Sequence, residues 1–138
     1  MEMTQEMIGQ AFMMGRLVDA MSFIGTILAI WLALRTANMT GENPKSNLLT
    51  KILSTGFGLC VMAGSYLQFT YAANTWIMAA RRMQELGVDS FSNPERTQGF
   101  IDYVGTTETA NSPTMLGIVF LAIITIMILG LIWGPRDS

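Results

Sequence analysis

Hydrophobic residues gather in three long runs, separated by polar segments that carry turn signals. The longest run, residues 52–80, contains no charged residue. The others are residues 17–34, in which Asp19 is the one charged residue, and residues 115–133, which are almost wholly apolar. Each run approaches or exceeds the roughly 20 residues that a helix needs to cross about 30 Å of hydrocarbon. The pattern predicts an all-α integral membrane protein with three transmembrane helices.

The segments around the first run predict a leading helix and a turn. Apolar side chains in residues 1–16 recur at helical spacing, which favours an amphipathic helix at the membrane interface. Residues 35–51 are expected to form a loop, because Asn43 and Pro44 are a turn signal. Such a turn makes the first two spans an antiparallel hairpin.

The second run is longer than one crossing needs, and its second half mixes aromatic and amide side chains. That mixture suits a membrane–water interface, so this helix is expected to leave the membrane and continue to about residue 86, where Gly87 stops it. Residues 88–114 are then an extramembrane loop with a short helix closed by Gly105. Together these segments predict a single membrane domain over residues 1–138.

Composition agrees with a membrane location. The chain is 51% hydrophobic and 13% charged, against roughly 25% charged for an ordinary soluble domain. The net charge of -2 is too small to indicate a nucleic-acid partner. With no histidine, one cysteine and no paired intramembrane carboxylates, the chain lacks the usual bases and ligands, so we expect no enzyme activity, no metal and no cofactor.

Basic residues divide evenly between the two expected sides of the membrane. One side carries Arg16, Arg81, Arg82 and Arg96, and the other carries Arg35, Lys45, Lys51 and Arg136. The second group lies in shorter segments, so the positive-inside rule favours an outside N-terminus and a cytoplasmic C-terminus. A signal peptide is the competing interpretation of the first run, but acidic residues precede it and no cleavage site follows it.

Residues spaced four apart along the first two runs, most of them small, form a candidate helix-packing interface. They are Gly25, Ala29 and Ala33 in the first run and Gly56, Cys60, Gly64, Gln68 and Ala72 in the second. Small side chains let two helix backbones approach closely in lipid. The two faces can close on each other within the chain or be offered to neighbouring copies. The third run lacks this spacing and is expected to be more lipid-facing.

Two polar features carry alternative interpretations. An acid within a span, such as Asp19, suggests a proton or ion site, yet Arg16 lies three residues earlier on the same helical face and pairs with it at the headgroup level in the simpler interpretation. Gln68 and Asn74 suit either a polar ligand between helices or ordinary interhelical hydrogen bonds. We therefore treat Arg16 and Asp19 as a candidate ion or polar site.

The first part of the chain has a distinctive order of elements. An amphipathic leader, an apolar helix, a short basic loop containing Gly41–Lys45 and a glycine-rich helix starting near Ile52 follow one another. This order resembles small inner-membrane and pilin-like subunits of conjugative and Dot/Icm-type secretion systems, over roughly the first 80 residues. The third span departs from their two-helix plan. The resemblance implies a location in a bacterial inner membrane and a subunit that packs against its own copies or a secretion core.

Three functions fit these observations. The first is a non-catalytic structural subunit of a membrane assembly, for which the resemblance indicates a secretion or conjugation apparatus. Its partners would be the lipid bilayer and its own copies or other membrane subunits. The second is an accessory subunit of a respiratory or redox complex. The third is an oligomeric pore former such as a phage holin. The paired small-residue faces favour the first, because they suit close helix packing.

Overall fold

A computed structural model describes residues 4–136, and over that range the chain is all helical, with no strand. The elements are α1 (Gln5–Glu42), α2 (Leu48–Leu86), the 3-10 helix η1 (Val88–Ser90), α3 (Pro94–Val104) and α4 (Met115–Trp133). The all-α prediction is confirmed, and three of the helices are long and apolar enough to cross a membrane. Residues 1–3, where the predicted amphipathic helix begins, lie outside the described residues.

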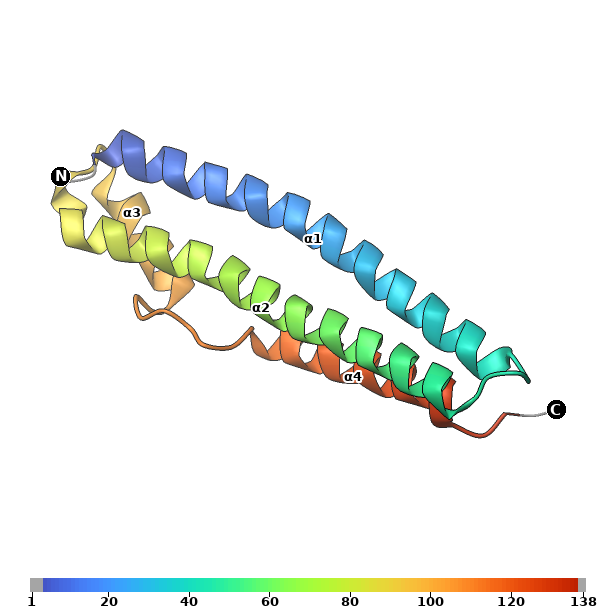
Figure 1. Ribbon diagram of the computed structural model, residues 1–138. Coiled ribbons are helices and arrows are strands. Elements are labelled where there is room, and N and C mark those ends of the chain that lie inside the picture. The colour runs from blue at the N-terminus through green and yellow to red at the C-terminus, as the bar shows by residue number, and fades with distance from the viewer. Residues whose placement is uncertain (1–3, 137–138) are drawn as a thin grey trace.

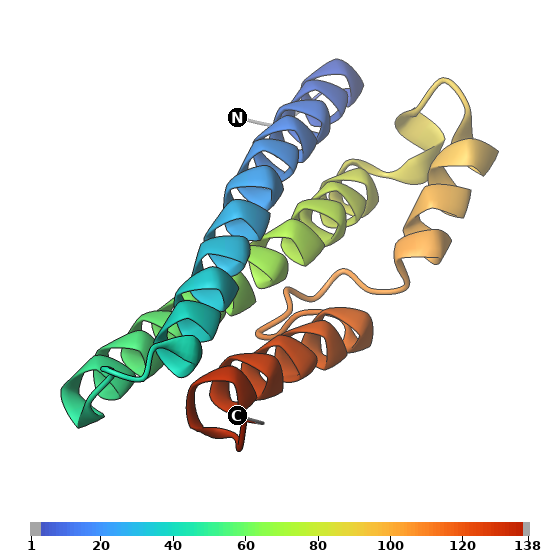
Figure 2. The same ribbon diagram turned by 90° about the vertical axis from the view of Figure 1, so that its right-hand side faces the viewer.

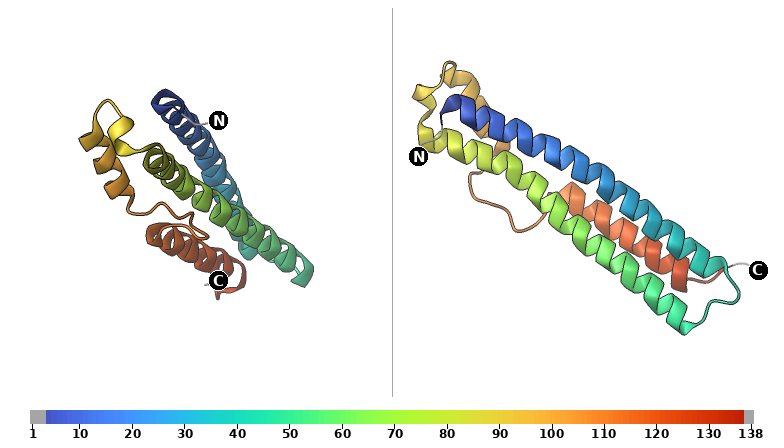
Figure 3. Two further views of the ribbon diagram at one scale, coloured as in Figure 1. Left: turned by 90° about the vertical axis from the view of Figure 1, so that its left-hand side faces the viewer. Right: turned by 45° about the horizontal axis from the view of Figure 1, so that its top comes forward.

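The fold is an elongated bundle (Figure 1). α1 and α2 lie side by side and run in opposite directions, and α4 packs along both in the half nearest their connection (Figures 1 and 3). α3 lies at the other end against α2, and an extended segment leads from it to α4 (Figure 2). The start of α1 and the end of α4 therefore lie at opposite ends of the long axis (Figure 1).

The bounds of α1 differ from the predicted ones. The expected interfacial helix over 1–16 and the expected span over 17–34 are one continuous helix, which starts where the Thr4 side chain accepts a hydrogen bond from the Met7 backbone N–H. No proline interrupts residues 5–42, so the chain has no strong local reason to break there. The change from a polar to an apolar sequence near residue 17 is therefore not accompanied by a break in the helix.

The connection between α1 and α2 is much shorter than the predicted loop over 35–51. It comprises residues 43–47 only, because α1 continues to Glu42 and α2 begins at Leu48. Pro44 accounts for the end of α1, since a proline disfavours helical geometry at the residue before it. Asn47 starts α2 by accepting a hydrogen bond from the Thr50 backbone N–H at 2.9 Å.

Two glycines end the helices at the far side of the molecule. Gly87 follows α2 with φ +97° and Gly105 follows α3 with φ +85°, and other residues rarely adopt such angles. α3 starts at Pro94, with the Asn93 side chain accepting from the Arg96 backbone N–H. These stops turn the chain back toward the start of α1.

Buried residues separate into two regions, which we call the trunk (residues 17–75 and 114–133) and the head (residues 4–16 and 76–104). The trunk core consists of Ile30, Ala33 and Ala37 from α1, Met62 from α2, and Leu121, Ile124, Ile128 and Ile132 from α4. The head buries Ile8, Ile77, Ala79, Ala80, Phe91 and Ile101. α4 thus supplies half of the trunk core along one face. Its apolar span is as buried as that of α2 and more buried than that of α1, so it is not the most exposed of the three, as had been expected.

Candidate functional site

The predicted small-residue interface is split between buried and uncovered positions. Ala33 is buried in the trunk core, whereas Ala29, Gln68 and Ala72 are half-buried. The remaining four, Gly25, Gly56, Cys60 and Gly64, are exposed, and we call them the open face. A Cβ atom added at any of its three glycines would meet no atom within 4 Å. Packing within the chain therefore leaves this part of the interface unused.

A shallow hollow of about 400 Å³ lies where the two predicted faces come nearest. Its lining residues are Ser22, Gly25, Thr26 and Ala29 from α1 and Val61, Gly64, Ser65 and Gln68 from α2. No residue of α4 lines it. α1 and α2 thus meet along this line without filling it, and it stays open on the side that α4 does not cover.

Gly58, which was not among the predicted interface residues, is the glycine at which α4 packs against α2. A Cβ atom at Gly58 would lie 2.8 Å from Cγ2 of Ile128, so only glycine lets α4 approach α2 this closely. Ser54, Gly58 and Met62 are all buried and lie four apart. The series Ser54, Gly58 and Met62 therefore has the same spacing of four as the predicted series that starts at Gly56, but is offset from it by two residues.

The candidate polar pair lies at the other end of the trunk. Nη1 of Arg16 is 3.8 Å from Oδ2 of Asp19, so the expected contact one helical turn apart is formed. Asp19 is only 8% exposed, and its Oδ2 accepts no hydrogen bond from any described residue. The Arg16 guanidinium also lies over the Trp76 ring, 5.1 Å from its centroid. The arginine thereby links an acid of the trunk to an aromatic ring of the head.

The two amides of α2 differ in what they contact. Asn74 donates through Nδ2 to the Ala110 carbonyl at 3.0 Å and accepts through Oδ1 from the Ala110 N–H at 2.7 Å. The amide of Asn74 thus hydrogen-bonds the segment before α4 to α2, so Asn74 has a structural role. Gln68 instead lines the hollow between α1 and α2.

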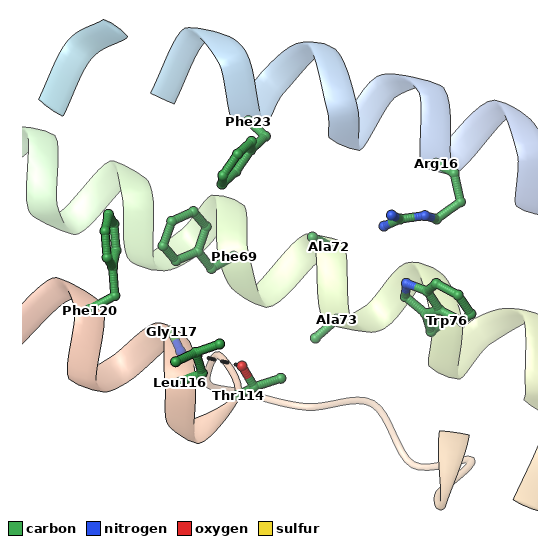
Figure 4. A pocket seen from close by; sticks show the side chains of 10 residues that line it. All are labelled: Arg16, Phe23, Phe69, Ala72, Ala73, Trp76, Thr114, Leu116, Gly117 and Phe120. Carbon is green, nitrogen blue, oxygen red and sulfur yellow. Dashed lines mark hydrogen bonds between the residues drawn. The ribbon is translucent and has the colours of Figure 1, made fainter. Parts of the chain in front are cut away.

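A second depression, which we call the aromatic groove, lies between α1, α2 and the start of α4 (Figure 4). It has a volume of about 510 Å³ and an open side. Its lining residues are Arg16, Phe23, Phe69, Ala72, Ala73, Trp76, Thr114, Leu116, Gly117 and Phe120. The phenylalanines of this groove come from three separate helices and share no local motif, so the sequence pattern does not predict it.

The side chains that line these sites are mostly apolar. Within residues 4–136 no group of three or more histidine, cysteine or acidic side chains is placed to hold a metal ion. Cys60 is a free, exposed thiol on the open face. The aromatic groove exposes aromatic rings, aliphatic groups and one guanidinium. At its three glycines, the open face exposes the helix backbone.

Comparison with protein-family models, with curated proteins and with solved structures finds no match to this chain.

Proposed function

We propose that the chain crosses a bacterial inner membrane three times and acts as a non-catalytic structural subunit of a larger membrane assembly. The dimensions of α4 support the placement, since its 19 residues at about 1.5 Å each match the hydrocarbon thickness of about 30 Å. The membrane slab then coincides with the part of the trunk that α4 covers. The first two spans form an antiparallel hairpin, and α4 returns the chain to the side of the α1–α2 connection.

Tryptophan and basic side chains flank this slab at both ends, as is typical of membrane–water boundaries. At one end Arg16 and Trp76 stack at the level where α4 begins, because they line the same groove as Thr114. At the other end Nζ of Lys51 lies 5.4 Å from the centroid of the Trp133 ring. The head then projects outside the membrane as a continuation of α1 and α2. On the positive-inside argument, it faces away from the cytoplasm.

The open face is the observation that carries the assembly role. Helices in lipid associate through close contacts of small residues, since the hydrophobic effect does not drive them together. α4 already occupies the other face of α2 through Gly58, while Gly56, Cys60 and Gly64 stay uncovered within the slab. A neighbouring helix can approach there as closely as α4 does at Gly58. Together with the resemblance to conjugative and Dot/Icm-type subunits, this favours a secretion or conjugation apparatus.

Substitution of a glycine on the open face tests the assembly role. Gly64→Leu should abolish the high-mass complex in gentle detergent, because the added side chain holds a second helix away, while the amount of protein in the membrane fraction stays unchanged. Gly130→Leu is the matched control, because Gly130 is also exposed and free of neighbours but lies on α4. The native mass of each complex is the measurement. If the complex of the Gly64→Leu variant has the same native mass as that of the wild-type chain, the assembly role is contradicted.

The native thiol of Cys60 distinguishes self-assembly from assembly with other subunits. Copies inserted in the same direction about a two-fold axis along the membrane normal present the same residues to each other. Mild oxidation of intact membranes should then join Cys60 to Cys60 and give a species of twice the chain mass. If the complex contains the chain only once, this species is absent and the partner is another protein.

A further inference from the structure

The aromatic groove has two chemically different ends (Figure 4). Arg16 and Trp76 stand at one end, and Phe23, Phe69 and Phe120 gather at the other, with centroid separations of 6.1 Å from Phe69 to each of its two neighbours. Two alanines of α2 form the floor between them. An apolar trough with a cation at one end fits an amphiphile that has an anionic head.

We propose that this groove binds an anionic glycerophospholipid, with the phosphate at Arg16 and one acyl chain directed toward the phenylalanines. The distance from Trp76 to Phe69 along α2 is seven residues, or about 10 Å, which accommodates part of an acyl chain. The volume of about 510 Å³ falls within the usual range of sites for small ligands.

Arg16 has the hydrogen-bonding capacity that a phosphate requires. A guanidinium carries five N–H donors, and Arg16 uses none of them in a hydrogen bond to any residue in 4–136. Its side chain is 44% exposed, so a headgroup can reach it. Asp19 lies 3.8 Å away but does not line the groove, so a ligand in the groove meets the cation first. The acid thus orients the guanidinium without blocking it.

The position of the groove favours a lipid over a soluble anion. In the proposed placement Arg16 lies at the boundary where lipid headgroups are found, and a guanidinium binds a phosphate through charge-assisted hydrogen bonds. A soluble phosphate would leave Phe23, Phe69 and Phe120 without a role. The groove shares no residue with the open face, so lipid binding and assembly can fail independently.

Native mass spectrometry of the purified full chain in detergent tests the proposal. Dioleoyl phosphatidylglycerol should bind about tenfold more tightly than dioleoyl phosphatidylcholine, a difference of about 1.4 kcal/mol. Both lipids carry a phosphate, but the cationic choline group of phosphatidylcholine cancels the net negative charge that would attract Arg16. Arg16→Gln should remove this preference. Ala73→Leu, which fills the floor, should weaken the binding of both lipids. Equal affinity of the wild-type chain for the two lipids, or an unaltered preference in Arg16→Gln, would overturn the proposal.

Arg35→Gln is the matched control for the charge. Arg35 is also an α1 arginine above a tryptophan, 5.5 Å from the centroid of the Trp31 ring, but it lies outside the groove. Its loss should leave the preference intact, and an equal loss in both arginine variants would mean that lipid binds by general charge alone. In the wild-type chain, glycerol phosphate should not displace phosphatidylglycerol; displacement would show that the phenylalanine end contributes nothing.

Discussion

The head and the trunk are built from the same two long helices but are held together differently. The trunk packs small residues of α1 and α2 against a row of isoleucines on α4, with Gly58 directly under Ile128. The head packs aromatic rings, since Phe12 meets Trp76 edge-on at 5.0 Å and Phe100 at 5.4 Å. In the proposed placement the head lies in water, where the hydrophobic effect favours the burial of large aromatic rings. The trunk lies in lipid, where close packing of small residues stabilises helix association.

The largest effect is expected from removing the central ring of the head. Trp76→Ala loses contacts with Phe12, Phe100 and the Arg16 guanidinium, and a change of this kind should destabilise the head by about 2–3 kcal/mol, because Trp76 is half-buried. Hydrogen exchange should accelerate in α3 and in the first turns of α1. Exchange in α4 should stay slow, and acceleration there as well would mean that the two regions unfold as one unit.

A smaller effect, confined to the trunk, is expected from Gly58→Leu. The new side chain would push Ile128 and α4 away from α2, at a cost of about 1–3 kcal/mol for overpacking. The midpoint of thermal unfolding in detergent should fall, and amide exchange in α4 should accelerate while α3 remains protected. Gly130→Leu meets open space and should leave the midpoint nearly unchanged. A normal midpoint for Gly58→Leu would refute the close packing of α4.

The smallest effect is expected at the tip of the head. Gln5 accepts from the Ser92 N–H at 3.1 Å and donates to the Ser92 hydroxyl at 3.0 Å. Both groups are exposed, so Gln5→Ala should cost about 0.5–1 kcal/mol. The expected result is faster exchange at Ser92 with no change in the trunk. Slower or unaltered exchange at Ser92 would show that these bonds do not hold η1 and α3 to α1.

Much of the helical content could be predicted from the sequence, because long apolar runs and strong stops are local signals. Gly87 marks the end of α2, and the pairing of Arg16 with Asp19 follows from a spacing of three on one helix. The continuation of α1 to Glu42 was missed, since the sequence becomes more polar after residue 34 but has no proline before Pro44. Sequence patterns thus located the elements better than their junctions.

The choice of packing face was beyond sequence patterns alone. Gly56 and Gly58 both belong to spacing-four series, and only the position of α4 decides which series is covered. α4 itself is apolar all round, so its sequence carries no signal for the face that contains Ile124 and Ile128. In a uniformly apolar helix, the sequence does not distinguish an isoleucine that is buried from one that is exposed.

The unbroken course of α2 through both regions has a mechanical consequence. A helix of 39 residues is a rod of about 58 Å, and tilting it by about 10° at the α1–α2 connection would carry its far end through about 10 Å. α1 runs beside it as a second rod of 38 residues, and α3 bridges the two where they end. A small change in the tilt of the trunk would therefore become a coordinated displacement of the head by about 10 Å.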